Sequence, residues 1–197
     1  MVITWYGEGC FKIQSSDTSI LVDPLESSSG LMPPRFKADL TLVTQSSFAN
    51  GDFPSMDIVG PGEYEVKNIE VSGVMLEADK TAYILKAEDM RLGFLGHVAN
   101  KALPPVAAEK IAGVDILFIP GGGSPYIDQE TAAKLIKQID PRIVVASFFK
   151  IPGLKRKSNE VKDFLNEMDQ KAEPQDRLTI KKKDLPVKRQ VVVLKRV

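Results

Sequence analysis

The chain has 197 residues, of which 43% are hydrophobic and 26% are charged, and its formal net charge is zero. This length gives a core large enough to fold without staples, and the single cysteine, Cys10, excludes a disulfide framework and a thiolate zinc site. The N-terminal residues lack the regions of a secretory signal, and no apolar run approaches the roughly 18 residues of a membrane span. We therefore expect one cytoplasmic domain over residues 1–197, without a membrane partner.

Short strand signals fill the first half of the chain. Three of them, separated by glycines and by the polar residues 15–17, predict an antiparallel meander over 2–6, 10–14 and 19–23. The unalternated apolar run 40–43 predicts a strand that is covered on both faces. Further strands are expected at 57–60, 63–66, 69–76, 81–87 and 90–95.

Helices and strands alternate in the second half. Buried strands are expected at 114–120 and 142–149, and a closing pair of strands at 177–180 and 190–194. Asp128 predicts the N-cap of a helix that Asp140-Pro141 ends, and Ser158 predicts the cap of a second helix. A third, short helix is expected at 105–112. The pattern predicts one α/β or α+β domain with two sheets.

Charge is unevenly distributed along the chain. Residues 150–197 carry 14 of the 26 Lys and Arg residues but only 7 of the 26 Asp and Glu residues. A basic C-terminal quarter on an acidic body would suit an anionic partner or a homo-oligomer, although solvated faces explain the same charges. Nucleic acid is an unlikely partner, because no aromatic residues interleave the basic runs 155–157 and 181–183.

The loop VTQSSFANGD at 43–52 follows the buried strand 40–43. In α/β architectures such strand ends collect ligands and catalytic groups. Gln45, Ser46, Ser47 and Asn50 can form a neutral pocket for a small polar ligand, or they can satisfy one another and the loop backbone. Neither serine lies in the nucleophile elbow that would activate it.

A second candidate loop contains Gly122 and Gly123, between the strand at 114–120 and the helix after Asp128. Backbone N–H groups exposed by these glycines can cradle an anion. A tight turn that allows close packing is the alternative.

Several segments together resemble the metallo-β-lactamase superfamily, in the small branch of Zn-dependent hydrolases similar to L-ascorbate-6-phosphate lactonase. They occur in the family's order and cover about residues 2–150. The segments are ITWYGEGCFKIQ, ILVDP, ADLTLVTQSSFAN, GPGEYEV, LGFLGHVANKAL, VDILFIPGGG and IDPRIVVASFFK. The resemblance implies an αββα sandwich of two mixed β-sheets flanked by helices, with the site at the sheet edges and Asp23 in a structural role.

The family binds zinc or another divalent metal through a T-H-x-H-x-D-H loop, and the metal activates a water. In the matching loop here, Gln45 and Ser47 take the places of the first two histidines, Ala49 that of the aspartate and Asn50 that of the last histidine. Amides and hydroxyls are weak donors to zinc, and alanine donates nothing.

The same replacement extends to distant segments. Phe94 stands where the next family histidine would be, Phe148 replaces the last one, and Glu8 stands in the Gly-His motif near the N-terminus. His97, the only histidine, lies at or next to the bridging-aspartate position. It is a candidate catalytic residue, as a general base or a lone ligand, or else an imidazole that fills the space of the lost metals.

The sequence therefore predicts a degenerate metallo-β-lactamase-fold protein with no cofactor, acting as a non-catalytic pseudoenzyme or a binding module for a small polar or anionic ligand. The alternative is a hydrolase of a phosphorylated or lactone-type small substrate, either metal-independent through His97 or with an atypical metal site.

Overall fold

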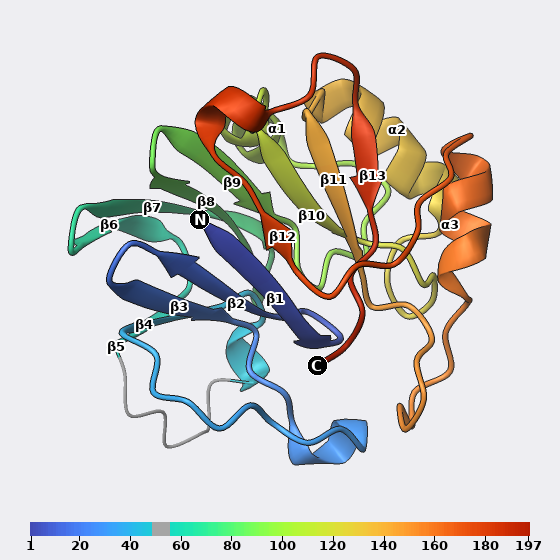
Figure 1. The fold of residues 1–197 in the computed structure, drawn as a ribbon, viewed down its shortest axis with the longest axis horizontal. Coiled ribbons are helices and arrows are strands. Elements are labelled where there is room, and N and C mark those ends of the chain that lie inside the picture. The colour runs from blue at the N-terminus through green and yellow to red at the C-terminus, as the bar shows by residue number, and fades with distance from the viewer. Residues whose placement is uncertain (49–55) are drawn as a thin grey trace.

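The computed structural model describes residues 1–48 and 56–197, and within these ranges the chain forms two β-sheets that face one another (Figure 1). The first sheet has the strand order β12-β1-β2-β3-β4-β5, and the second has the order β13-β11-β10-β9-β8-β7-β6. The first sheet consists of β1 (Val2–Gly7), β2 (Cys10–Ser15), β3 (Thr18–Val22), β4 (Leu40–Val43), β5 (Met56–Val59) and β12 (Leu178–Thr179). The second consists of β6 (Gly62–Val66), β7 (Ile69–Glu77), β8 (Lys80–Ala87), β9 (Met90–Phe94), β10 (Ile116–Pro120), β11 (Ile143–Ser147) and β13 (Gln190–Val192).

Both sheets are mixed, as the sequence predicts. The expected meander β1-β2-β3 is antiparallel, and β4 then pairs in parallel with β3 and β5. In the second sheet β6 to β9 are antiparallel, whereas β9, β10, β11 and β13 are parallel. All four residues of β4 are buried, which confirms the strand expected to be covered on both faces.

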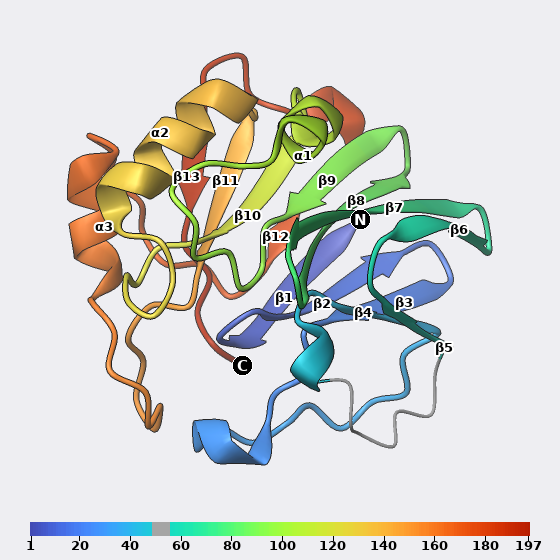
Figure 2. The same ribbon diagram turned by 180° about the vertical axis from the view of Figure 1, so that it is seen from behind.

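The described residues form three α-helices, α1 (Pro105–Ile111), α2 (Gln129–Ile139) and α3 (Val161–Glu167); α1 and α2 lie against the second sheet, and α3 lies beside α2 (Figure 2). Helix α1 contacts β7 and β8, and α2 contacts β10 and α3. Asp128 caps α2 as predicted, because its side chain accepts the N–H of Thr131 at 2.8 Å. Short 3-10 helices occur at Ser27–Ser29, Ser46–Phe48 and Lys182–Asp184. No helix within the described ranges is both long and apolar enough to cross a membrane.

Two details of the sequence prediction are wrong. Helix α3 begins at Val161, so Glu160 occupies the N-cap position in place of Ser158. The expected closing pair of strands does not pair with itself: β12 extends the first sheet beside β1, and β13 extends the second beside β11. Each strand finds its partner far away in sequence, where a local pattern of apolar residues gives no information.

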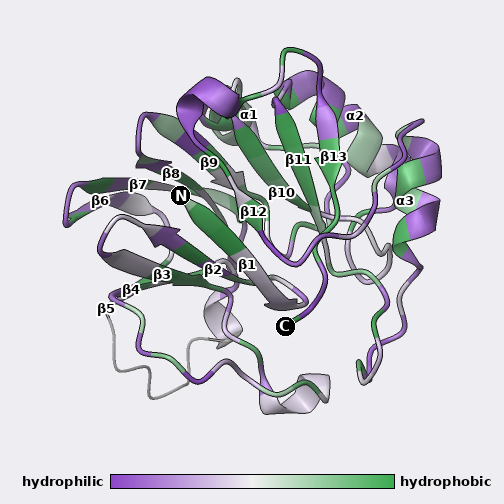
Figure 3. Cartoon of the chain, in the orientation of Figure 1, coloured by the Kyte–Doolittle hydropathy of each residue, from purple (hydrophilic) through white to green (hydrophobic). Residues whose placement is uncertain are grey.

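Aromatic side chains join the two sheets across the core. Phe11 on β2 meets Phe118 on β10 with ring centroids 4.7 Å apart, and Phe94 on β9 stacks on Phe118 at 4.4 Å. Hydrophobic residues dominate β10 and β11, while the exposed face of α2 is polar (Figure 3). The core fixes the spacing of the sheets, and the loops after β3, β4, β9, β10 and β11 meet at one edge.

Candidate functional site

A cavity of about 250 Å³ lies at this edge. Its walls combine apolar side chains with several titratable ones, and they come from the β1–β2 turn and from segments that follow β3, β9, β10 and β11. The lining residues are Glu8, Gly9, Asp23, Pro24, Leu25, Glu26, Ser28, Ser29, Val43, His97, Tyr126, Phe148, Leu154 and Arg156. The volume is somewhat below that of sites for drug-sized ligands, so it suits a small molecule.

Asp23, Thr44 and His97 form the buried polar centre of the site. Asp23 follows β3, and its two carboxylate oxygens lie 2.7 Å from the backbone N and the hydroxyl Oγ1 of Thr44, the residue after β4. The same hydroxyl lies 2.7 Å from Nδ1 of His97. Nδ1 and the nearer Asp23 oxygen are 3.7 Å apart, so Thr44 bridges the two side chains.

Gly96 permits this close approach. It adopts a left-handed φ of +47°, and a Cβ atom there would lie 2.0 Å from Thr44 Oγ1. Any other residue would therefore push the segment that carries His97 away from β4.

Burial changes the protonation of both ionisable groups in the centre. It raises the pKa of Asp23 to about 7, against the two hydrogen bonds from Thr44, which lower it. Burial lowers the pKa of His97 to about 3, and the positive charges of Lys80 and Arg156 act in the same direction. His97 is thus a neutral imidazole at neutral pH, and its contact with Asp23 is not an ion pair.

Three rings pack together beside this centre. The ring of Phe148 lies with its centroid 5.0 Å from that of His97 and 4.5 Å from that of Tyr126. Phe148 adopts a left-handed φ of 57°, which is unusual for a bulky residue. Gly9 makes room for it, since a Cβ on Gly9 would lie 2.6 Å from the Phe148 ring. The rings give the cavity an apolar wall next to the polar centre.

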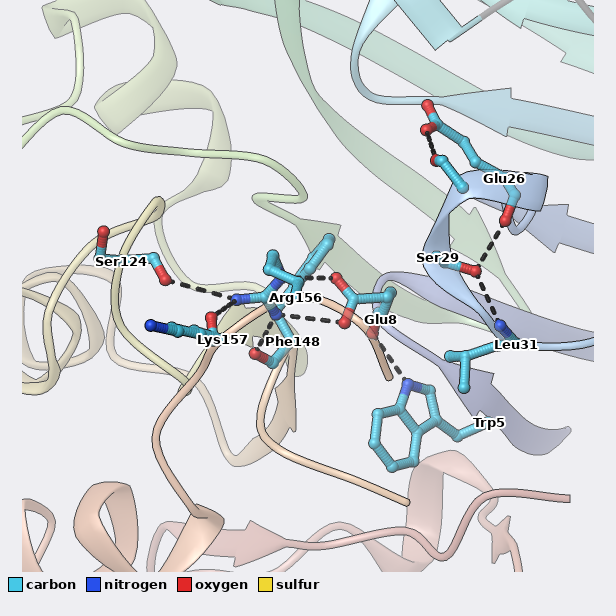
Figure 4. A network of polar contacts seen from close by, with 10 residues as sticks. Trp5, Glu8, Glu26, Ser29, Leu31, Ser124, Phe148, Arg156 and Lys157 are labelled. Carbon is cyan, nitrogen blue, oxygen red and sulfur yellow. Dashed lines mark hydrogen bonds and ion pairs between the residues drawn. The ribbon is translucent and has the colours of Figure 1, made fainter. Parts of the chain in front are cut away.

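Arg156 and Glu8 hold the segment after β11 against the β1–β2 turn (Figure 4). The guanidinium donates to both carboxylate oxygens at 3.1 Å each, and also to the carbonyl oxygens of Phe148, Ser124 and Lys157 at 2.6, 3.4 and 3.1 Å. These contacts engage all five N–H groups of the guanidinium. Burial raises the pKa of Glu8, while its contacts with Arg156 lower it.

The polar side chains of the predicted ligand loop lie away from the cavity. Gln45 donates to Asp79 at 3.0 Å, and the Ser47 hydroxyl lies 3.5 Å from the same carboxylate, in the turn between β7 and β8. The backbone N–H of Ser46 donates to the Asp79 carbonyl. Asn50, the fourth predicted member, lies outside the described residues.

The other predicted positions divide between the cavity and its supports. His97 and Phe148 line the cavity, whereas Phe94 is a core residue that is 1% exposed. Gly122 supports the site indirectly, because a Cβ there would lie 2.1 Å from the carbonyl oxygen of Phe148. The carbonyl of Gly123, at a φ of +72°, accepts the N–H of Tyr126 and so shapes the turn that carries this ring.

Sequence reasoning missed Thr44, Tyr126 and the partnership of Glu8 with Arg156. Thr44 stands first in the loop that matches the family motif, but a threonine in a sequence does not indicate which side chains its hydroxyl will contact. The sequence places Arg156 in the basic run 155–157, whereas the structure pairs it with Glu8 and makes it part of the cavity wall. Glu8 replaces the histidine of the Gly-His motif. This acidic residue is the one sequence signal that indicates a basic partner.

The two facing mixed sheets, with a site at the edge where their strands end, define a metallo-β-lactamase-like fold. The family model described as the beta-lactamase superfamily domain matches residues 2–147, and the chain therefore belongs to this superfamily. A UPF0173 protein of Pyrococcus furiosus is 27% identical over 177 residues, which cover 74% of this chain and 81% of the relative. A Thermotoga maritima crystal structure, named provisionally as a Zn-dependent hydrolase of the metallo-beta-lactamase superfamily, has a TM-score of 0.85 and 25% identity, covering 98% of both chains.

These relatives correct the prediction that no cofactor is involved. The Thermotoga protein is named for zinc, and CmlA of Streptomyces venezuelae, with a TM-score of 0.66 at 13% identity over 91% of this chain and 54% of its own, is named as a diiron β-hydroxylase. Metal binding is therefore typical of the superfamily. The replacement of individual ligand positions does not by itself exclude a cofactor for the whole chain.

The donor set on the described residues does not fit a family-type metal centre. No three His, Cys, Asp or Glu side chains within 1–48 and 56–197 lie together in a way that could hold a metal ion. Phe94 and Phe148 carry no donor atoms, and Gln45 and Ser47 are directed at Asp79. Asp23 and His97 are both engaged by Thr44.

Proposed function

We propose that this chain is a binding member of the superfamily, a pseudoenzyme whose cavity takes a small, uncharged molecule with an apolar body and a hydrogen-bonding end. The observation that carries the proposal is the pairing of Arg156 with Glu8, because Arg156 is the one cation among the described lining residues and Glu8 already neutralises it.

The pairing neutralises the basic group that an anionic ligand would need. All five N–H groups of Arg156 already have acceptors on the protein. The carboxyl groups of Asp23 and Glu26 line the same cavity. A phosphate or carboxylate would have to enter beside these groups without a compensating charge, which is strongly unfavourable in a buried site. This favours an uncharged ligand over the anionic one that the sequence left open.

The walls suit the apolar part of such a ligand. Leu25, Val43, Leu154 and the ring of Phe148 provide contact surface, and Tyr126 adds an aromatic face. His97 is the neutral polar group next to this surface. A few polar groups in a mostly apolar cavity are typical of small-molecule sites.

The chemistry of the described residues argues against turnover through His97. A general base works best when its pKa lies near the working pH, and a pKa of about 3 makes the imidazole a weak base. The hydroxyl of Thr44 bonds to His97, but it is 1% exposed and is not part of the cavity wall. The Ser28 and Ser29 hydroxyls bond to Glu26.

The second candidate function is hydrolysis of a lactone-type small substrate. The superfamily's hydrolase fold and the His97–Thr44–Asp23 chain favour it, since a hydrogen-bonded imidazole can orient a water at a carbonyl. A phosphorylated substrate is disfavoured for the reason given for anions.

Both candidates are tested with a short-chain γ-lactone and its ring-opened hydroxy acid. Calorimetric titration of each, with chromatography of the recovered lactone, separates binding from turnover. We expect the lactone to bind and to be recovered intact, and the hydroxy acid to bind at least tenfold more weakly. Hydrolysis that His97→Gln abolishes would establish the second candidate, and tighter binding of the hydroxy acid would overturn the proposal for an uncharged ligand.

A further inference from the structure

We propose that the hydroxyl of Tyr126 selects the ligand of the cavity, by donating a hydrogen bond to an acceptor oxygen at the ligand's polar end. The ligand class is thereby narrowed to uncharged carbonyl compounds, such as lactones and cyclic ketones. This inference rests on the proposed function, because it concerns the ligand of the same cavity.

The ring of Tyr126 is held from several sides. The residue follows β10, and its backbone N–H donates to the carbonyl of Gly123 at 3.2 Å. The ring centroids of Phe148 and His97 lie 4.5 and 5.5 Å from its own, and the guanidinium carbon of Arg156 lies 5.1 Å from it. A ring packed in this way holds its hydroxyl in place before a ligand arrives, which reduces the entropic cost of binding.

The hydroxyl of Tyr126 makes no hydrogen bond to the residues in 1–48 and 56–197. Its oxygen is not enclosed by protein either, because Oγ of Ser158 is the one buried side-chain oxygen or nitrogen in these ranges that lacks a partner. Tyr126 lines the cavity. Its hydroxyl is therefore an accessible group that a ligand can meet.

The charged groups of the cavity act on this hydroxyl. Burial raises the pKa of Tyr126, and the carboxyl groups of Glu8, Asp23 and Glu26 raise it further. The positive charge of Arg156 opposes them. All four charged side chains line the cavity, so the hydroxyl end of the ring lies on the cavity side. The phenol keeps its proton at neutral pH and can donate it.

The other side-chain donors in the described cavity wall are already engaged. The hydroxyl of Ser28 donates to the Glu26 carboxylate at 2.7 Å, and that of Ser29 donates to the Glu26 carbonyl at 2.6 Å (Figure 4). The N–H groups of Arg156 have acceptors on the protein. His97 is engaged with other protein groups. The phenol is thus the donor that remains for a ligand.

Acceptors are more abundant on the same wall, because the carboxyl groups of Asp23 and Glu26 belong to it. A donor on a ligand can be met by these groups. An acceptor oxygen that leaves water for the cavity needs a donor, and without one it costs about 1–3 kcal/mol. The Tyr126 hydroxyl meets this need, so it decides whether a carbonyl compound binds.

Tyr126→Phe removes the hydroxyl and keeps the ring. Two probes of similar size are titrated by calorimetry: the short-chain γ-lactone, whose oxygens only accept, and a pyrrole with the same side chain, whose N–H only donates. We expect the affinity for the lactone to fall roughly three- to tenfold in the variant, and the affinity for the pyrrole to stay within about twofold. Tyr6→Phe is the matched control, because Tyr6 is not among the described lining residues, and it should leave both affinities unchanged.

The chain has one histidine, so a nitrogen-15 label on histidine reports His97 alone. The lactone should shift its signals, because the rings of His97 and Tyr126 lie 5.5 Å apart. Equal lactone affinities of the natural chain and Tyr126→Phe, or an equal fall for the pyrrole, would overturn the inference and leave the proposed function standing. A lactone that binds neither chain, or that binds without moving these signals, would overturn the proposed function and the inference with it.

Discussion

The guanidinium of Arg156 donates two hydrogen bonds of 3.1 Å to the carboxylate oxygens of Glu8, although 148 positions separate the two residues in sequence. Their side chains are 19% and 14% exposed, so the pair is largely withdrawn from water. Arg156 also binds the carbonyl of Phe148, whose left-handed backbone is unusual for a bulky residue. One side chain therefore fixes the turn at Glu8, the ring of Phe148 and the outer wall of the cavity.

Arg156→Met should destabilise the chain by about 2–3 kcal/mol, because it leaves a largely buried carboxylate without its partner. Urea denaturation measures the loss, and Lys157→Met, an exposed neighbour, is the matched control, with an expected change within about 0.5 kcal/mol. The double variant Glu8→Gln/Arg156→Met should recover part of the stability, since no unpaired carboxylate remains. Losses that simply add would show that the two side chains do not interact.

Asp23 and His97 should impose opposite pH dependences on stability. The folded pKa of Asp23 is raised from 3.8 to about 7, so its contribution is present below pH 4 and is lost as the pH rises to about 7. The folded pKa of His97 is lowered from 6.5 to about 3, so its contribution is present above pH 6.5 and is lost as the pH falls to about 3. Between pH 4 and 6.5 the two slopes largely cancel.

Asp23→Asn removes one of these slopes. Between pH 4 and 6.5 the free energy of unfolding of the variant should rise with pH more steeply than that of the natural chain, by up to about 1.4 kcal/mol per pH unit. Denaturation of both chains across this range gives the difference, in which the other titrating groups cancel. Parallel curves would mean that Asp23 titrates at its ordinary pKa.

Gly96→Ala should be far more costly than Gly113→Ala. Both glycines have a positive φ, of +47° and +65°, so each substitution carries a backbone cost of about 1–2 kcal/mol. A Cβ at Gly113 meets nothing within 4 Å, whereas one at Gly96 lies 2.0 Å from Thr44 Oγ1. We expect a further loss of at least about 2 kcal/mol at Gly96, together with a changed His97 resonance. Equal losses in thermal denaturation would contradict this contact.

Substitutions in the loop after β4 should leave ligand binding unchanged. Gln45→Ala and Ser47→Ala remove contacts with Asp79 that are half-exposed or exposed, so each should cost no more than about 1 kcal/mol. Lactone affinity should stay within twofold of the natural chain. Phe148→Leu, which removes an aromatic wall, provides the comparison and should weaken binding. A large effect of either loop variant would place the ligand on the other side of β4.

The sequence predicts the strands well because alternation and apolar runs are local properties. The sequence predicts that β12 and β13 pair with each other, because their actual partners, β1 and β11, lie far along the chain and leave no local signal. In the candidate site, too, the sequence predicts what depends on local pattern and does not predict what depends on tertiary contacts. The resemblance located the strand end at Thr44, but only the fold directs Gln45 and Ser47 towards Asp79. The pairing of Glu8 with Arg156 likewise depends on segments that folding alone brings together.

Binding of an uncharged molecule beside His97 is tested most directly by titrating the histidine-labelled chain with the γ-lactone and, separately, with its hydroxy acid at one pH. We expect the single histidine resonance to move and saturate with the lactone, which stays intact, and to remain in place with the hydroxy acid. A resonance that responds to the hydroxy acid and ignores the lactone would contradict the proposed function.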